Sequence, residues 1–157
     1  MKVNTKVRYG LRAMLQIAKH YGDDPVPIST IAKSQDISGK YLEQVVVALR
    51  KAELISSHKG VRGGYTLTRS PSEITLWDII SALDSHTALV DCVVDPSSCE
   101  RSQYCLSHVI WKMLSQRMQE FWTSYTLQDL IEKVDTAEFL TSKQTNHCPP
   151  TAKKVDQ

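Results

Sequence analysis

The sequence predicts a mainly α-helical protein: a winged helix-turn-helix with a small β-hairpin wing, plus a long C-terminal dimerisation helix. Three observations favour this fold class. Two short amphipathic helices are joined by a tight turn, two β-prone runs flank a tip rich in glycine and cations, and a long apolar helix follows an already complete small domain. The 157 residues are enough for one domain with a modest core, or for a small domain with an extension.

Hydrophobic periodicity predicts the first three helices. The first covers residues 5–21 and ends where Gly22 and Pro25 interrupt the pattern. Its predicted apolar stripe consists of Val7, Leu11, Met14, Ala18 and Tyr21. A short helix follows over residues 29–34, and Ser38 then N-caps a third helix that extends to about Ala52. The buried stripe of this third helix is Leu42, Val45, Val46 and Leu49.

The front of the third helix is where a recognition helix reaches base edges in the major groove. The predicted DNA contacts there are Ser38, Lys40, Tyr41, Glu43 and Gln44. A glutamine can form two hydrogen bonds with adenine, and a glutamate can accept one from cytosine N4. The alternative for each of these residues is an ordinary solvated helix face.

Residues 54–67 predict the wing. Two β-prone runs surround a tip whose three glycines let the backbone approach a phosphate. Lys59 and Gly60 are predicted phosphate or minor-groove contacts, and Arg62 is a third candidate.

The remaining elements complete the predicted domain organisation. Capping boxes at Thr75–Asp78 and Thr126–Asp129 open two short helices, and a long apolar helix covers residues 106–122. We therefore expect a winged helix-turn-helix domain (1–84), a metal-binding loop (85–105), the dimerisation helix with a short following helix (106–135) and a disordered tail (136–157).

Charge is distributed unevenly along the chain. Residues 1–70 carry 12 Lys/Arg against 5 Asp/Glu, whereas residues 71–157 carry 7 against 12. A basic front half suggests that this half faces a polyanion, and the alternative is chance clustering of solvated charges.

Several classes of protein are disfavoured. No run approaches the ~20 apolar residues that span a bilayer, and the first residues lack the features of a secretory signal. We therefore expect a cytoplasmic protein with no membrane partner. The chain contains no Gly-rich phosphate loop after a strand, no nucleophile elbow and no HExxH motif, and we expect no enzyme.

Three of the four cysteines fall within 14 residues, in the pattern Cys92-x6-Cys99-x5-Cys105-x2-His108. In a cytosolic protein such a cluster is more often a metal or redox site than a disulfide framework. Thiolate and imidazole ligands together suit zinc or an iron–sulfur centre. Cys148 lies in the tail and is predicted to be a free thiol.

Several separate segments carry a resemblance to a known family. They are Arg8-Tyr9, Ala13-Met14-Leu15, Tyr41-Leu42-Glu43-Gln44, Leu49-Arg50-Lys51, Gly63-Gly64-Tyr65 and Cys105-Leu-Ser-His108. In these segments the chain resembles the Rrf-type (BadM/Rrf) winged-helix transcription regulators, over nearly its whole length to about residue 135.

The resemblance implies a homodimer that binds a double-stranded DNA operator with two half-sites about one helical turn, or a multiple, apart. It implies a repressor, in similar proteins sometimes also an activator, of genes for iron–sulfur cluster biogenesis or for iron, redox or nitric oxide responses. Three cysteines and a nearby histidine are the ligand set of the [2Fe–2S] branch of the family. The resemblance therefore implies that Cys92, Cys99, Cys105 and His108 bind a [2Fe–2S] cluster that controls DNA binding. Cluster-assembly proteins are candidate donors of that cluster, and Glu43 would discriminate between operator classes.

Three alternatives stay open at this point. One is a winged-helix regulator with a structural Cys₃His zinc site and another effector, or with cysteines that bind no metal. Another is a [4Fe–4S] cluster that senses nitric oxide or iron. The third is an electron-transfer or redox enzyme, which would leave the basic helix-turn-helix unexplained.

Overall fold

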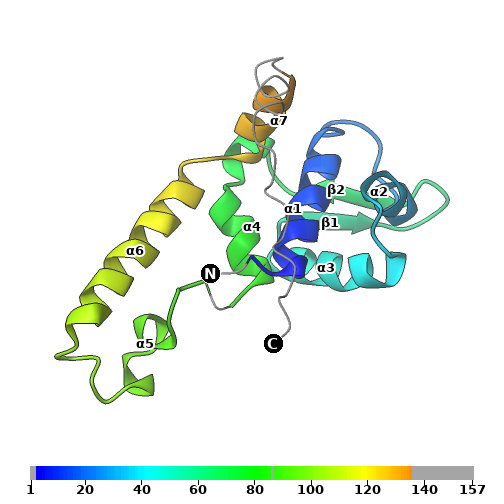
Figure 1. Ribbon diagram of the computed structural model, residues 1–157. Helices are drawn as coiled ribbons and strands as arrows, with labels where there is room; N and C mark the ends of the chain where they lie inside the picture. Colours follow the sequence, from blue (N-terminus) through cyan, green and yellow to red (C-terminus); the bar gives the residue numbers. More distant parts are fainter. Residues whose placement is uncertain (1–2, 86, 136–157) are drawn as a thin grey trace, which may run out of the picture.

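The computed structural model describes residues 3–85 and 87–135, and its mainly helical fold with one small hairpin confirms the predicted fold class. The elements are α1 (Thr5–Ala18), α2 (Ile28–Gln35), α3 (Gly39–Lys51), β1 (Ile55–His58), β2 (Gly64–Leu67), the 3₁₀ turn η1 (Pro71–Glu73), α4 (Leu76–Leu83), α5 (Asp91–Val94), the 3₁₀ turn η2 (Pro96–Ser98), α6 (Leu106–Thr123) and α7 (Leu127–Asp135) (Figure 1). The predicted tail, 136–157, lies outside the described residues.

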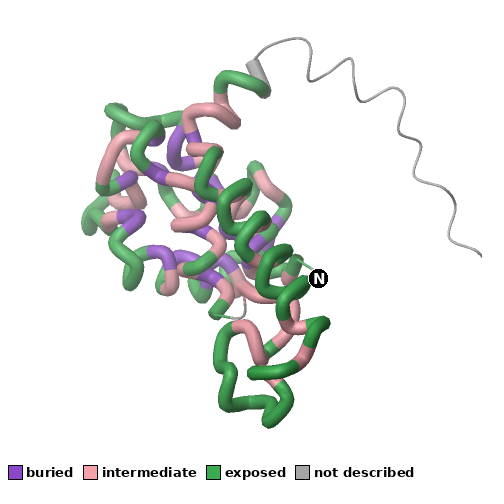
Figure 2. Tube along the Cα trace, turned by 90° about the vertical axis from the view of Figure 1, so that its left-hand side faces the viewer, coloured by how far each residue is buried: buried purple, intermediate pink, exposed green. Residues whose placement is uncertain are grey.

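The helices α1 to α4 enclose the hydrophobic core. Figure 2 shows the buried residues gathered in this part of the molecule. The predicted stripe of α3 is confirmed, because each of its four residues is at most 3% exposed. Other fully buried side chains are Met14 and Ile17 of α1, Ile31 of α2 and Ile79 of α4. No helix in the described part of the chain is long and apolar enough to cross a membrane.

The end of α1 differs from the prediction. The helix ends at Ala18, three residues before Tyr21, and Tyr21 is 51% exposed. The backbone N–H groups of His20 and Tyr21 instead donate to carbonyls three residues back, and Gly22 adopts a φ of 92°. The tighter turn carries Tyr21 away from the buried stripe, although its spacing continues the helical pattern.

The wing is anchored to the core at its base. β1 and β2 pair antiparallel from Ile55↔Leu67 to His58↔Gly64. On its other edge β2 bridges to Val26, whose N–H donates to the Tyr65 carbonyl at 3.0 Å while the Tyr65 N–H donates to the Val26 carbonyl at 2.9 Å. A Cβ on Gly64 would lie 2.5 Å from the carbonyl group of Val26, so only glycine permits this approach.

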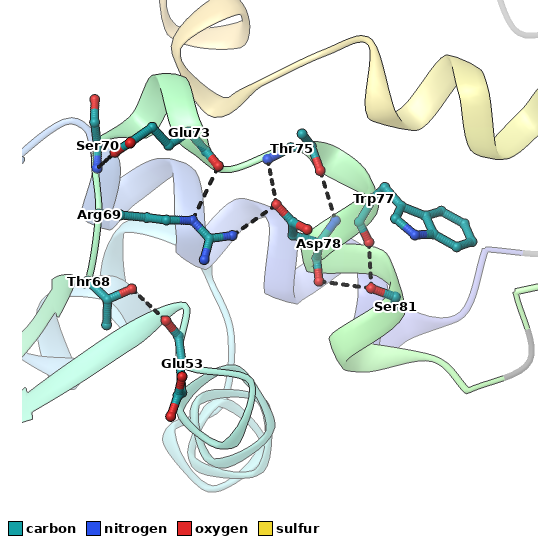
Figure 3. A network of polar contacts seen from close by, with 9 residues as sticks. All are labelled: Glu53, Thr68, Arg69, Ser70, Glu73, Thr75, Trp77, Asp78 and Ser81. Atoms are coloured by element: carbon teal, nitrogen blue, oxygen red, sulfur yellow. Dashed lines mark hydrogen bonds and ion pairs between the residues drawn. The ribbon is translucent and has the colours of Figure 1, made fainter.

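A polar network fixes the chain where it leaves the wing (Figure 3). Arg69, two residues after β2, donates from Nη2 to Asp78 Oδ2 of α4 at 3.0 Å and from Nε to the Glu73 carbonyl at 3.2 Å. The same Asp78 carboxylate accepts from the Thr75 N–H, and the Thr75 hydroxyl accepts from the Asp78 N–H. This is the predicted capping box, and Arg69 ties the wing to it.

The last two helices behave differently from each other. α6 stands beside α4, and none of its residues is buried (Figures 1 and 2). α7 returns to the core, where Leu127 is fully buried and donates its N–H to the Ile74 carbonyl. The predicted capping box at Thr126 and Asp129 is also present, and the Thr126 N–H and hydroxyl hold the pKa of Asp129 below its usual value.

We predict that Gly64→Ala lowers the free energy of unfolding by about 1–3 kcal/mol, because the added methyl group meets backbone rather than a movable side chain. Gly39→Ala is the matched control: nothing lies within 4 Å of its Cβ position, and we expect no loss of stability. Urea unfolding followed by circular dichroism measures both. Equal stability of the two variants would contradict the proposed role of Gly64.

Candidate DNA-binding surface and metal centre

One face of α3 is exposed and polar. Ser38 caps the helix, its hydroxyl accepting from the Tyr41 N–H at 3.3 Å. Because the buried stripe turns Leu42 and Leu49 inward, the face left toward solvent carries Lys40, Glu43, Gln44 and Val47. These positions span about 100° of the helix circumference, so all four lie on one face of α3.

The other two predicted contacts on α3 have further structural roles. The Tyr41 side chain is half-buried, and its ring lies edge-on against that of Tyr9 with centroids 5.6 Å apart. Ser38 is exposed, but its hydroxyl is already engaged in the helix cap. The structure therefore places both at the edge of the exposed face, where packing and capping hold them in position.

The wing tip projects its predicted contacts into solvent. Lys59, Gly60 and Arg62 are all exposed, and Gly60 adopts a φ of 110°, which favours glycine. The Gly63 N–H donates to the Gly60 carbonyl at 2.9 Å and closes the turn. Within the described residues no ion pair involves Lys40, Lys59 or Arg62, so their charges are available to a polyanion.

The four predicted metal ligands come from three successive elements, the short α5 and η2 and the first turn of α6. Cys92 lies in α5, Cys99 follows η2, and Cys105 occupies the N-cap position of α6, with His108 in its first turn. The His108 Nδ1 atom lies 3.5 Å from Cys92 Sγ. The structure thus brings together two predicted ligands that are 16 residues apart in the sequence.

Cys99 and Cys105 are not joined to this pair. Cys99 is exposed, and the Cys105 thiol lies 3.0 Å from the Ser107 hydroxyl. This hydroxyl, together with the His108 backbone N–H and the charge of Arg101, holds the pKa of the Cys105 thiol below its usual value. Among the described residues, no three His, Cys, Asp or Glu side chains lie close enough to hold a metal ion. Cys148 lies outside the described residues.

Sequence reasoning missed α5 and the aromatic contact beneath α3. α5 has only four residues, too few to show a helical period, although Asp91 at its start is typical of a first turn. The Tyr9–Tyr41 contact joins two helices, so no local pattern predicts it.

The outer face of α6 is apolar and uncovered. Large hydrophobic side chains that are 43–89% exposed lie on it at helical spacing. They are Leu106, Val109, Ile110, Met113, Leu114 and Phe121, which we call the α6 apolar face. An exposed patch of this kind marks an interaction surface.

Comparison with known proteins agrees with this architecture. The family model Rrf2, described as an iron-dependent transcriptional regulator, matches residues 3–133. The HTH-type transcriptional regulator IscR of Sodalis glossinidius is 40% identical over 131 residues, which cover 83% of this chain and 79% of that protein.

Two solved structures share the fold. CymR (YrzC), the global cysteine regulator of B. subtilis, superposes with a TM-score of 0.71 at 36% identity, covering 86% of this chain and 99% of that one. T. potens IscR superposes with a TM-score of 0.71 at 32% identity, covering 94% and 93%. The relatives are named as transcription regulators and not as enzymes, and this chain belongs to the Rrf2 family of winged-helix transcription regulators.

Proposed function

We propose that this chain is a homodimeric transcription regulator whose affinity for its operators is set by an iron–sulfur cluster on Cys92, Cys99, Cys105 and His108. The observation that carries the proposal is the 3.5 Å approach of Cys92 Sγ to His108 Nδ1, because it joins two ligand types that suit such a cluster. The description of the matching family model as iron-dependent supports a role for iron.

Three thiols and one imidazole fit an iron–sulfur cluster, and the local structure leaves room for all four ligands to come together. Cys99 and Cys105 flank a segment, residues 100–104, that has no buried residue, so these two thiols can approach the pair without disturbing the core. We propose the [2Fe–2S] type, which the resemblance of the ligand set to the iron–sulfur branch of the family implies. When bound, the cluster supplies a group whose presence and oxidation state respond to cluster supply, iron or oxidants.

Contiguous packing connects this site to α3. α5 packs on α6, α6 packs on α4, and α4 packs on α3. The Leu89 N–H also donates to the Ser115 hydroxyl of α6 at 3.5 Å, which holds the ligand segment against the helix. We propose that cluster binding shifts α6 and thereby the spacing of the two recognition helices in the dimer. The regulated genes would serve cluster biogenesis or iron and redox responses, with repression and in some cases activation as outcomes.

The DNA contacts divide into two kinds. Glu43 and Gln44, on the exposed face of α3, would contact base edges and set the sequence preference. Lys40, at the helix start, lies on the same face. Lys59 and Gly60 at the wing, with Arg62 as a third candidate, would contact phosphates or the minor groove. Ser38 and Tyr41 lie at the edge of the same surface.

The cluster is tested by anaerobic purification with visible absorption, iron and sulfide assays. We expect about two irons and two sulfides per chain, lost in Cys92→Ala and reduced in His108→Ala. Cys148→Ala is the matched control and should keep the cluster. One zinc per chain without sulfide would contradict the proposed iron–sulfur cluster but not the DNA-binding fold. About four irons per chain would indicate a [4Fe–4S] cluster instead of the proposed [2Fe–2S] type.

The dimer is tested on the α6 apolar face. We expect Ile110→Glu to raise the dissociation constant of the dimer at least about 100-fold, because a carboxylate would be buried there without a partner. Gln119→Glu adds the same charge nine residues later, on the opposite side of α6, and should leave the dimer intact. Sedimentation velocity gives the mass of each species. A monomeric wild-type protein would contradict the homodimer.

The base contacts are tested with a duplex enriched from a random-sequence pool by the wild-type protein, and with a scrambled copy of it. Gln44→Ala should weaken binding to the enriched duplex about 5- to 150-fold without changing the salt dependence. Lys59→Ala should weaken binding to both duplexes by the same factor and should lower the slope of log K against log salt concentration. If Gln44→Ala affected both duplexes equally, Gln44 would not be a base contact.

A further inference from the structure

We propose that Arg12 of α1 binds an operator phosphate on the side of α3 opposite the wing. The surface that carries it, which we call the α1 arginine edge, consists of Arg8, Tyr9 and Arg12 of α1 with Gln35 of α2. The inference rests on the proposed function, since it requires the winged helix to bind DNA.

The two flanks of α3 lie against different parts of the molecule. Tyr41 packs against Tyr9 of α1, with ring centroids 5.6 Å apart. Nine residues later, Arg50 donates from Nη1 to the Ser57 hydroxyl of β1 at 3.3 Å. Because an α-helix turns by about 100° per residue, nine residues bring Arg50 to the opposite side of the helix from Tyr41. The exposed face of α3 is therefore bordered by the wing on one side and by α1 on the other.

The dimensions of DNA make both borders relevant. A helix with its side chains is about 10–12 Å across, and the major groove is about 12 Å wide. A helix that fills the groove therefore has a phosphate backbone along each of its flanks. The wing supplies cations to one backbone, and the α1 arginine edge lies where it would meet the other.

Arg12 is held in place before any ligand binds. Its Nε donates to Gln35 Oε1 at 3.0 Å, and its guanidinium carbon lies 5.8 Å from the centre of the Tyr9 ring. Arg8 lies at the same distance from that ring. With Nε engaged, the Nη atoms of Arg12 make no ion pair within the described residues, and the side chain is exposed. A fixed guanidinium loses less conformational freedom when it binds a phosphate.

The charge of α1 supports the same partner. The helix carries Lys6, Arg8 and Arg12 and contains no acidic residue. An anion that approaches this side of α3 therefore meets only positive charge on the helix, which strengthens and steers binding at moderate salt.

The test is DNA binding by Arg12→Gln, measured by fluorescence anisotropy on the enriched duplex and its scrambled copy between about 50 and 200 mM salt. We expect affinity for both duplexes to fall about tenfold by the same factor, because a phosphate contact carries no sequence information. The slope of log K against log salt should fall by about 0.9 for each protomer that loses the contact.

Three further variants make the result specific. Lys19→Gln removes the same charge at the C-cap of α1, about two turns beyond Arg12, and should change affinity less than about twofold. Arg12→Lys should keep the wild-type salt slope. Gln35→Ala leaves the charge but frees the side chain, and should weaken binding less than Arg12→Gln at an unchanged slope.

The outcomes separate this inference from the proposed function. If the wild-type protein binds neither duplex, both fail together. If the wild-type protein binds DNA and Arg12→Gln has no larger effect than Lys19→Gln, the proposed function stands. The proposed phosphate contact of Arg12 is then overturned. Thermal unfolding by circular dichroism checks that each variant is folded, and the exposed position of Arg12 predicts that it is.

Discussion

The burial of one stripe of α3 against α1 and α4 is the interaction on which the rest of the structure depends. Leu42, Val45 and Leu49 are fully buried, and burying each such side chain contributes about 1.5–3 kcal/mol. Turning the helix by one residue would move Leu42 and Leu49 toward solvent and would bury Gln44 in one direction, or Glu43 and Arg50 in the other. The core therefore decides which face of α3 reaches DNA, and it also brings Tyr41 to α1 and Arg50 to the wing.

α4 connects the DNA-binding surface to the rest of the chain. It packs on α1 and α3 on one side and on α6 on the other. Its capping residue Asp78 accepts from Arg69, so the exit of the wing is tied to the same helix (Figure 3). In the proposed regulator, a displacement of α6 would therefore reach the recognition helix and the wing through α4, which packs against both α6 and α3.

The second half of the described chain lacks a core of its own. No residue of α5, η2 or α6 is buried, and the α6 apolar face, which Arg117 interrupts between Leu114 and Phe121, is exposed to solvent. Two kinds of bond can complete such a region. A second copy would cover the α6 apolar face, and metal–thiolate bonds would order the ligand segment where packing does not. The α6 apolar face and two of the proposed ligands, Cys105 and His108, belong to the same helix. Dimer formation and cluster binding are therefore physically linked in the proposed regulator.

Much of the fold followed from local patterns in the sequence. The N-cap of α3 at Ser38 and both capping boxes depend on residues within one helical turn, and the buried stripe of α3 depends on a spacing repeated over about two turns. All of these are confirmed. The prediction for Tyr21 was wrong because apolar spacing continued beyond the hydrogen bonds that end α1 at Ala18. For the candidate site, the sequence identified residue types and spacing, and the cluster they are proposed to bind stays a prediction.

The sequence by itself determined which of the longer segments are helices, which face of α3 is buried, and where cations and thiols lie along the chain. The tertiary structure alone decided that Cys92 meets His108, that α7 returns to the core beyond α6, and that Gly64 lies against Val26. It also placed Arg12 beside Gln35 at the edge of α3. The physical reason is range: periodicity and capping act over a few residues, whereas these contacts depend on how whole helices pack.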